Sequence, residues 1–506
     1  MKEVKSIKYN YHWFVLFIIL PSVFLHSYDI TLVPFGEHAW AQSDHYALAL
    51  GFLDNNFDFF HPQTFALNHQ FPSKSPIVNP QGITSVDFPL LHFVVALLMK
   101  GLGTDAPFVY RITTLIWSWA GLLSLYRAIT FIKDYKIALV ITSLIALQPI
   151  FVYYQDGFHV SIAAFSTFLI GLSFLIYYHK SHSIKLFYLG ITFITLATLM
   201  RFTHIICLLA LALLFFVLII KYKKWYSQLG SIIVGGILVI AYFGYNIYLQ
   251  QTYGSVFLNK PVLSDGLADE LKNLLILVRN YTLKFLPIFH FSLISVGLFL
   301  LKKSKVNISK SKNILFFSIV YGLGLLVFTL VMAWSLKTHN YYALDTWMPW
   351  LVLNLVLLFT SIPSKIYQGK RYRNLYLLFI FLSFIYSGYS QYKNYYKSGE
   401  TDSIIQDFTK AKTFIEDVID KREPYIILCG YGYNTPLIAT KTKAFRIHHY
   451  DLDYPIEKEI EFHSPKILVV HDFNFKESNP RMIEQFKKNH ILFARTQNIS
   501  IWKIKK

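Results

Sequence analysis

Seven residues whose side chains can exchange protons or hold charged groups stand beside apolar stretches in this 506-residue chain. Ionisable side chains are costly within or beside membrane spans, so residues of this kind are functional candidates by default. They are Asp44 in HAWAQSDHYALALGFLD, Asp87 in SVDFPLLH, Asp156 and His159 in VYYQDGFHV, Arg201 in ATLMRFTH, and His339 and Tyr342 in KTHNYYALD. Together they point to chemistry at the surface of a membrane.

Most members of this set also have an interpretation that needs no chemistry. These are solvation for Asp44, helix capping for Asp87 and Asp156, packing or capping for His159, contact with lipid headgroups for Arg201, and an interfacial aromatic belt for His339. Convergence of the set on one membrane face would therefore be more informative than any single position.

The composition indicates an α-helical membrane protein with many spans. Hydrophobic residues make up 54% of the chain, charged residues make up 15%, and the mean hydropathy is +0.41. A soluble chain of this length would need more charge to cover its surface. Apolar runs such as IICLLALALLFFVLII from Ile205 and ILFFSIVYGLGLLVFTLVMAW from Ile314 are typical of membrane helices, which need about 20 apolar residues to cross a bilayer.

The formal net charge of +19 does not indicate nucleic-acid binding, because of where the basic residues lie. They cluster in short loops between apolar runs: KYKK from Lys221, KKSKVNISKSK from Lys302 and SKIYQGKRYR from Ser364. This pattern places such loops in the cytoplasm. The two cysteines, Cys207 and Cys429, allow at most one bridge and no cysteine metal site.

We expect eleven membrane spans, with the N-terminus inside and the C-terminus outside. The positive charges of Lys2, Lys5 and Lys8 predict a cytoplasmic N-terminus. The apolar run after them lacks a signal-peptide cleavage site, so we expect it to remain as the first span. The predicted spans lie at about 12–33, 107–131, 135–153, 156–178, 184–200, 203–221, 228–249, 283–301, 313–335, 343–362 and 374–391.

An acidic outer loop is predicted at about 34–106. Within it, FPLLHFVVALLMKGLG from Phe88 is apolar but only about 15 residues long, which is short for a span. If it crossed the membrane, Arg127, Lys133 and Lys136 would lie outside and every later basic loop would be inverted. We therefore expect an amphipathic helix along the outer interface.

A small α/β domain outside the membrane is predicted at 395–506, after a transmembrane domain at 1–394. Charges become dense there, and the β-like runs YIILCG, KILVV, ILFAR and ISIWKI accompany the helical patterns TKAKTFIEDVIDK and NPRMIEQFKKN. The segment CGYGYNTP from Cys429 lacks the third glycine of a dinucleotide fingerprint. It favours a strand-to-helix turn in which Thr435 caps a helix and Pro436 takes its first position.

The ordered motifs resemble those of bacterial GT-C glycosyltransferases, the group related to protein O-mannosyltransferases and lipid A aminoarabinose transferases. Trp40, Gln42 and Asp44 match the pattern Trp-Arg-Gln-x-Asp-Thr of the first outer loop in that group, whereas Ala41 and His45 depart from it. The resemblance covers most of about 12–362 and depends on the order of several weak motifs.

Four later segments are similar to blocks of the same group, each with a departure. They are SVDFPLLH with Asp87 in place of Glu, LQPIFVYYQDGFHV with Val160 and Ser161 in place of Pro-Asp, LATLMRFTH with Arg201 in place of Lys, and HNYYAL with Asn340 in place of Asp.

The resemblance implies an inverting transfer of a sugar from a polyprenyl-phosphate donor to a glycan, lipid or protein of the cell envelope. The reaction would take place on the outer face of the cytoplasmic membrane of a bacterium. Asp44 would take the acceptor's proton, and Asp87 would hold the acceptor or orient Arg201. Arg201, His339 and Tyr342 would bind the donor phosphate.

The resemblance leaves the use of a metal open, because some relatives use a divalent cation and others do not. Asp156 and His159 are candidates for a second acid or for metal ligands. Asp44 with Asp156 could hold Mg²⁺ or Mn²⁺ through oxygen atoms. The absence of Pro-Asp at Val160 and Ser161 argues against that site.

Three other functions are compatible with a polytopic membrane protein. A transporter or flippase of lipid-linked sugars would use charges in the middle of the membrane and often has internal repeats, whereas this chain shows no repeat and its polar set lies at one face. An O-antigen ligase or polymerase usually has its large loop late in the chain. An inactive relative is the third alternative, because the chain departs from the motifs at Ala41, Val160, Ser161 and Asn340.

Overall fold

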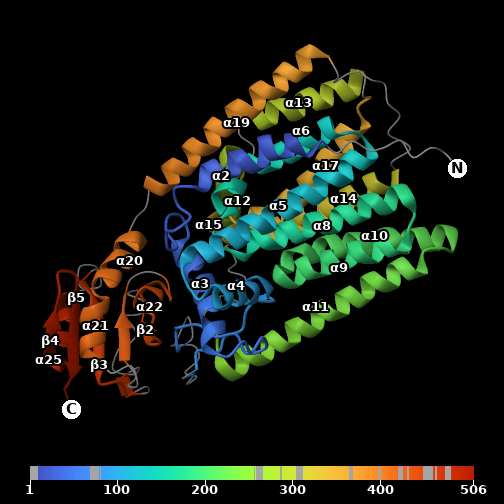
Figure 1. Cartoon of the computed structure of the whole chain (residues 1–506). Helices are drawn as coiled ribbons and strands as arrows, with labels where there is room; N and C mark the ends of the chain where they lie inside the picture. Colours follow the sequence, from blue (N-terminus) through green and yellow to red (C-terminus); the bar gives the residue numbers. More distant parts are fainter. Residues whose placement is uncertain are drawn as a thin grey trace. The chain divides into compact units, whose positions relative to one another are not determined.

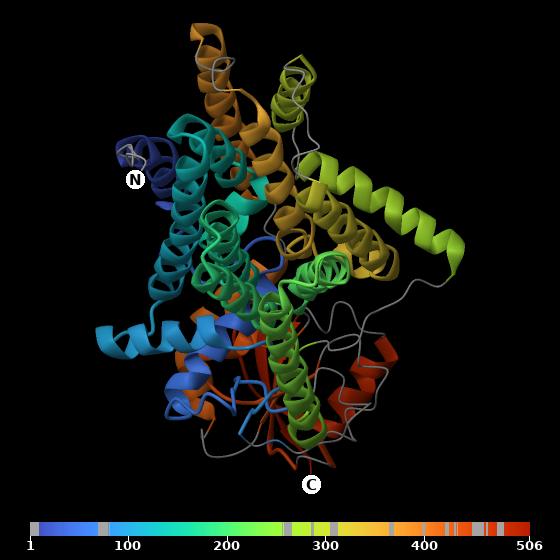
Figure 2. The same ribbon diagram turned by 90° about the vertical axis from the view of Figure 1, so that its right-hand side faces the viewer.

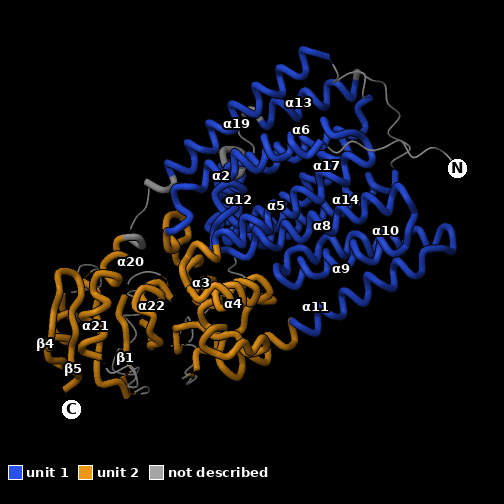
Figure 3. Tube along the Cα trace, viewed as in Figure 1, with its two compact units in different colours: residues 1–31, 111–242, 260–393 blue, residues 32–110, 243–259, 394–506 orange. Residues whose placement is uncertain are grey.

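The computed structural model divides into two compact units (Figure 3). Unit 1 comprises residues 1–31, 111–242 and 260–393, and unit 2 comprises residues 32–110, 243–259 and 394–506. The predicted outer loop therefore shares a unit with the C-terminal α/β domain. The residues that the structure describes are 10–68, 79, 81–255, 257, 266–284, 288–303, 312–363, 369–396, 400–419, 425–429, 432, 434–447, 460–461, 464–472 and 480–505. Lys2, Lys5 and Lys8, which set the predicted orientation, lie outside these residues.

Unit 1 is a bundle of helices around an apolar core (Figures 1 and 2). Helix α8 packs along α9, and α10 packs against α14. The bundle contains α1 (Tyr11–Phe14), the π-helical η1 (Val15–Ile19), α2 (Leu20–His26), most of α5 (Pro107–Ile132), α6 (Tyr135–Ala146), α7 (Pro149–Gln155), α8 (Val160–Ser181), α9 (Ile184–Met200), the 3₁₀ turn η3 (Phe202–His204), α10 (Ile205–Tyr222), the first part of α11 (Tyr226–Tyr253), α12 (Leu267–Lys284), α13 (Ile288–Lys303), α14 (Lys312–Val331), α15 (Ala333–Thr338), α16 (Tyr342–Asp345), α17 (Trp347–Ser361) and most of α19 (Lys370–Tyr396).

A helix lies in each of the eleven predicted span intervals, but the count of eleven spans is not confirmed. Among the described residues, five helices are long and apolar enough to cross a membrane: α5, α8, η3 with α10, α11 and α14. The helices at 11–26, 184–200 and 347–361 are apolar but shorter. At 1.5 Å per residue, a helix of 15 residues spans about 22 Å, less than the hydrocarbon core of about 30 Å.

The predicted span at 135–153 is two helices, α6 and α7, bent by 73°. Pro149 opens α7, and Gln148 before it is extended, with φ −75° and ψ 133°. A residue before proline is disfavoured in the helical region, so the sequence LQPI breaks the helix. The break sets the direction of α7, which ends immediately before Asp156.

Unit 2 joins the outer-loop helices to a five-stranded mixed sheet of order β2-β1-β3-β5-β4. Strand β1 is parallel to β2 and β3, whereas β5 is antiparallel to β3 and β4. Its other elements are α3 (Ala39–Asp54), α4 (Leu90–Leu102), α20 (Glu400–Lys410), α21 (Lys412–Val418), β1 (Tyr425–Leu428), α22 (Thr435–Thr440), β2 (Phe445–Ile447), β3 (Ile467–His471), α25 (Pro480–Asn489), β4 (His490–Arg495) and β5 (Ile499–Ile504).

The four predicted strands are present, and β2 is an addition that the sequence pattern does not show. It has only three residues, with the buried Arg446 at its centre, so it lacks an apolar run. Two predicted caps are wrong. The N-cap of α22 is Asn434, one residue before Thr435, and the N-cap position of α4 is Pro89, two residues after Asp87.

The outer loop continues the sheet beyond β2. Ala66 forms a parallel bridge with Ala444, and the Leu67 backbone N–H donates to the Ala444 carbonyl over 3.0 Å. The side chain of Asn68 accepts from the Arg446 backbone N–H and donates to the Arg446 carbonyl. Backbone groups at an open sheet edge need partners, and this loop supplies them to β2.

Candidate functional site

The candidate base Asp44 lies in the interior of unit 2, with 3% of its surface exposed. Helix α3 carries it. Its Oδ1 atom accepts two hydrogen bonds from Asn434, one from the backbone N–H over 3.2 Å and one from the side-chain Nδ2 over 2.8 Å. Among the residues that the structure describes, the hydrogen bonds to this carboxyl group all reach Oδ1. Asn434 thus holds one oxygen of the carboxyl group.

Asn434 also holds the outer loop. Its Oδ1 atom accepts from the backbone N–H groups of Phe65 and Ala66, each over 3.1 Å. A single amide therefore joins α3, the outer loop and the turn that precedes α22. Gly432, two residues earlier, has φ 60°, and a Cβ atom there would lie 2.7 Å from Cβ of Trp40. Only glycine allows this turn to approach α3 so closely.

The surroundings of Asp44 bring the pKa of its carboxyl group close to neutral pH. Burial raises the pKa of Asp44 to about 7, because the charged form loses its hydration. The hydrogen bonds from Asn434 and the charge of Arg446 lower the same pKa and offset part of this effect. A carboxyl group with a pKa near the working pH is suited to accept a proton.

Two histidines fix α3 against α4. Nδ1 of His45 lies 3.0 Å from Nε2 of His92, and the two rings stack with centroids 5.1 Å apart. Burial lowers the pKa of His92 to about 3, so this ring is neutral at pH 7. Asp44 and His45 are adjacent on α3, and the histidine pair restricts the rotation of that helix.

Asp87 is half-buried in unit 2, ahead of α4. The residue before it is fixed, because Val86 exchanges two backbone hydrogen bonds with the side chain of Asn246 in α11. Asp87 therefore follows a residue whose backbone is anchored to α11.

In unit 1 the predicted phosphate-binding residues come together. Nε of Arg201 donates to Oδ2 of Asp345 over 2.8 Å, and its guanidinium carbon lies 5.0 Å from the centre of the Tyr342 ring. The Tyr341 ring lies 5.6 Å from that of His339 and 3.9 Å from that of His159. We call this set, namely Arg201, Asp345, Tyr341, Tyr342, His339 and His159, the arginine cluster.

Two features of the arginine cluster were not predicted. Asp345 is buried and also accepts a hydrogen bond from the hydroxyl of Ser161 over 2.7 Å. The only sequence feature that points to Asp345 is its position at the end of the segment KTHNYYALD. In addition, burial lowers the pKa of His339, so its ring is neutral at pH 7. Arg201 is therefore the permanent cation of the cluster. His159 has a structural contact as well: it caps α8 by accepting a hydrogen bond from the Ser161 backbone N–H.

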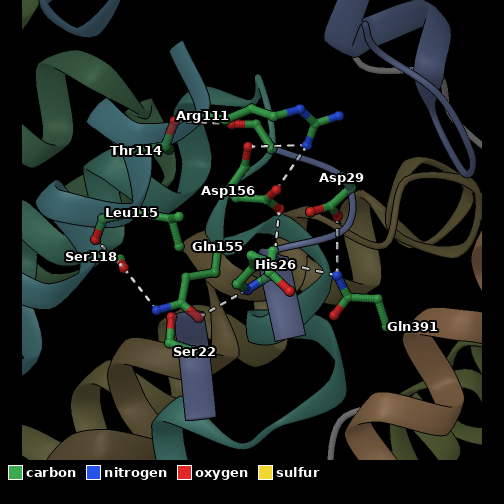
Figure 4. Close-up of polar contacts among 12 residues, drawn as sticks. Ser22, His26, Asp29, Arg111, Thr114, Leu115, Ser118, Gln155, Asp156 and Gln391 are labelled. Carbon is green, nitrogen blue, oxygen red and sulfur yellow. Dashed lines mark hydrogen bonds and ion pairs between the residues drawn. The ribbon is translucent and has the colours of Figure 1, made fainter. Parts of the chain in front are cut away.

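Asp156 belongs to a different buried network in unit 1 (Figure 4). Its Oδ2 atom accepts from Nη1 of Arg111 over 2.9 Å, and its Oδ1 atom lies 3.1 Å from Nδ1 of His26. Nε2 of Gln391 donates to Asp29 over 3.3 Å and also lies 3.3 Å from the His26 ring. The network holds two carboxyl groups, one guanidinium and one imidazole.

Among the residues that the structure describes, atoms able to ligate a metal converge in this network. His26, Asp29 and Asp156 offer ligand atoms within 4.8 Å of one another. Both oxygens of Asp156 already meet cationic or donor groups, however, and a cation would have to displace Arg111. The arrangement fits a charge-balanced ion network better than the oxygen-rich site that Mg²⁺ prefers. The predicted partner Asp44 lies in unit 2, outside this network.

No protein-family model and no curated protein matches the chain by sequence. Several solved structures resemble it in fold. ArnT from Cupriavidus metallidurans bound to undecaprenyl phosphate gives a TM-score of 0.63 at 9% identity, over 97% of this chain and 98% of that chain. The apo oligosaccharyltransferase of Archaeoglobus fulgidus gives 0.51 at 14% identity, over 91% and 70%. The arabinofuranosyltransferase AftD from Mycobacteria gives 0.57 at 12% identity, over 98% and 40%.

These likenesses confirm the fold expected from the motifs. The chain has the fold of GT-C glycosyltransferases, with a helical membrane part and a small C-terminal sheet. At such identities the likeness concerns the fold, and function has to be argued from the site.

The raised pKa of Asp44 predicts a pH-dependent stability. In an unfolded chain the group titrates near 3.8, and in the folded chain near 7. Between these values the folded state binds more protons, so the free energy of unfolding falls as the pH rises. Asp44→Asn keeps an oxygen for Asn434 and removes the charge. We expect it to be more stable than the wild type at pH 8, by up to roughly 4 kcal/mol, and to differ less at pH 5.

Unfolding of the purified protein in detergent at both pH values measures this effect. Asp105→Asn, which changes an exposed carboxyl group of unit 2, is the matched control and should leave the pH dependence unchanged. Equal pH dependence of the wild type and Asp44→Asn would contradict the burial argument.

Proposed function

We propose that this protein is a glycosyltransferase of the cytoplasmic membrane of a bacterium. It moves a sugar from a polyprenyl-phosphate donor to a glycan, lipid or protein of the cell envelope, with inversion. The observation that carries the proposal is the fold shared along almost the whole chain with an ArnT structure that holds undecaprenyl phosphate. The fold likeness to an Archaeoglobus fulgidus AglB bound to dolichol-phosphate, at a TM-score of 0.50 and 11% identity, supports the same class of lipid.

Asp44 acts as the general base. As the acceptor oxygen forms its bond to the anomeric carbon, the acceptor proton passes to Asp44. The bond between the anomeric carbon and the donor phosphate oxygen breaks, and its electron pair leaves with the polyprenyl phosphate. With a pKa near 7, Asp44 is ionised in a large part of the molecules at neutral pH. Asp87 is assigned to hold the acceptor.

The leaving phosphate gains negative charge, and Arg201 is the residue assigned to stabilise it. The bond to Asp345 and the nearby Tyr342 ring fix the plane of the guanidinium group. A planar guanidinium matches two phosphate oxygens at once. His339 is neutral, so its contribution is a hydrogen bond, and Tyr342 contributes its ring and hydroxyl group.

The proposed reaction contains no metal-dependent step. Zinc is present in one fold relative, the Archaeoglobus fulgidus oligosaccharyltransferase with Zn and sulfate, at a TM-score of 0.53 and 12% identity. In this chain the converging ligand atoms of His26, Asp29 and Asp156 are engaged with Arg111 and one another. We therefore assign a positioning role to this network, because it ties the ends of α2 and α7 together.

The transfer reaction is tested with the purified full chain, radiolabelled polyprenyl-phosphate sugars and a panel of envelope acceptors. We expect labelled product from the wild type. Loss of the base in Asp44→Asn should lower the rate by about 100-fold or more, and loss of the phosphate partner in Arg201→Ala should do the same. Arg127→Ala, an exposed arginine on α5, is the control and should retain the wild-type rate.

The alternative function, transport of lipid-linked sugars, gives a different outcome in proteoliposomes. Movement of the labelled lipid across the bilayer without any product on the acceptors would favour a flippase and refute the transferase. No observation on the described residues favours this alternative.

The role of Asn434 is tested by the pH dependence of the rate. Its donors favour the ionised form of Asp44, so Asn434→Ala should raise the pKa of Asp44 above about 7. The acidic limb of the rate profile should then move to higher pH, with recovery of activity near pH 9. Asn68→Ala is the matched control, because Asn68 also anchors the outer loop but bonds to Arg446. If both variants lose activity equally at every pH, Asn434 has a structural role only.

The proposed orientation places the N-terminus in the cytoplasm and the C-terminal domain outside. A tag at the C-terminus should then be removed by protease added to cells with a permeable outer envelope and an intact cytoplasmic membrane. Protection of the tag until that membrane is broken would refute the orientation without bearing on the chemistry of Asp44.

A further inference from the structure

A cavity of about 730 Å³ lies within unit 1, away from both clusters described above. Its walls come from α1, η1, α6, α13, α17 and α19. Most of the wall is apolar, with Phe17, Val140, Leu293, Val296 and Phe359 among the lining side chains. A cavity of this size is in the range of pockets that hold small ligands, about 300–1,000 Å³.

The mouth of this cavity is cationic. Lys136, Lys370 and Arg373 line it, all three are exposed, and none of the described residues that line the cavity is acidic. The nearest acid in sequence, Asp134, is engaged as the N-cap of α6, where its carboxylate accepts from the backbone N–H groups of Lys136 and Ile137. Among the described lining residues, no carboxylate neutralises these cations.

Aromatic side chains accompany the cations. Trp13, Tyr135 and Tyr372 line the cavity close to the first residues of α1, α6 and α19. Tryptophan and tyrosine prefer the level of lipid headgroups, where one part of the ring system is apolar and another polar. The residue types at the mouth are thus those found at the level of lipid headgroups. The rest of the wall is apolar, as acyl chains are.

The cavity lies at the end of unit 1 opposite to the ion network. Helix α19 begins at Lys370 beside the cavity and reaches Gln391, which contacts Asp29. These 21 residues span about 30 Å of helix. Helices α19, α13 and α6 each contribute side chains to the cavity wall, and Figure 1 shows α19 running along the bundle. Arg201, His339 and Tyr342, which are proposed to bind the donor phosphate, are not among the residues that line the cavity.

We propose that this cavity binds an anionic phospholipid of the membrane. The phosphate lies against Lys136, Lys370 and Arg373, and the acyl chains lie along the apolar wall toward Val296 and Phe359. A free phosphate ion would leave the wall empty, and an uncharged lipid would leave three cations without a counterion. Basic pockets between membrane helices hold lipid headgroups by this combination of charge and apolar contact. The site does not depend on the proposed transfer reaction.

Native mass spectrometry of the full chain, purified in non-ionic detergent, tests the proposal. The probes are phosphatidylglycerol, phosphatidylcholine and undecaprenyl phosphate. We expect phosphatidylglycerol to bind at least tenfold more tightly than phosphatidylcholine. The variant Lys136→Gln/Lys370→Gln/Arg373→Gln should lose this preference, and Lys221→Gln/Lys223→Gln/Lys224→Gln, which removes three exposed lysines elsewhere, should keep it.

A second variant tests the apolar wall with the charges intact. Val296→Trp fills the cavity and should lower phosphatidylglycerol binding at least tenfold. Because the three charge changes are at exposed positions, the folded charge variant should be recovered, and Val296→Trp is compared after its folding has been checked by thermal unfolding. Equal binding of the two phospholipids, or unchanged binding in the charge variant, would overturn the proposal. Capture of undecaprenyl phosphate that is lost in the charge variant would overturn it as well, because the occupant of the cavity would then be the carrier lipid.

Discussion

The pair of hydrogen bonds from Asn434 to Asp44 is the constraint on which unit 2 depends. A carboxyl group in a protein interior is tolerated only when donors compensate for its lost hydration. Here the donors come from a residue 390 positions later in the chain. The same amide accepts from Phe65 and Ala66, and the outer loop then continues along β2. The outer loop and the C-terminal domain consequently form one compact unit, and the environment of the candidate base is set by both.

Unit 1 places its buried charges where helices are interrupted. Asp156 follows the helix pair broken at Pro149, Arg201 occupies the extended residue between α9 and η3, and Asp345 ends α16 just before α17. A continuous membrane helix satisfies its own backbone and offers few polar positions. An interruption provides both a change of direction and room for an ion pair. The arginine cluster and the ion network are therefore consequences of broken helices, with aromatic rings closing the space around the charges.

The two ends of unit 1 have opposite chemical characters. At one end, acids pair with Arg111 and Arg201 inside the protein, and those pairs hold helix ends together. At the other end, Lys136, Lys370 and Arg373 are exposed around an apolar cavity. The positive-inside rule accounts for such a bias along the membrane normal. On the proposed orientation, the lipid-binding cavity would lie at the cytoplasmic end of unit 1, and the paired acids would lie at the other end.

Sequence patterns determined the class of the protein and most of its elements, because apolar periodicity and the spacing of basic loops are local signals. They correctly indicated helices in each predicted interval and four strands. Only the tertiary structure decided which charges meet. Asp345, Asn434 and the partners of Asp156 come from distant segments, and a single sequence carries no record of such pairings. The strand centred on Arg446 was also decided by packing, because it has no apolar run. The break at Pro149 is a local effect of the sequence LQPI, although the predicted span at 135–153 runs through it.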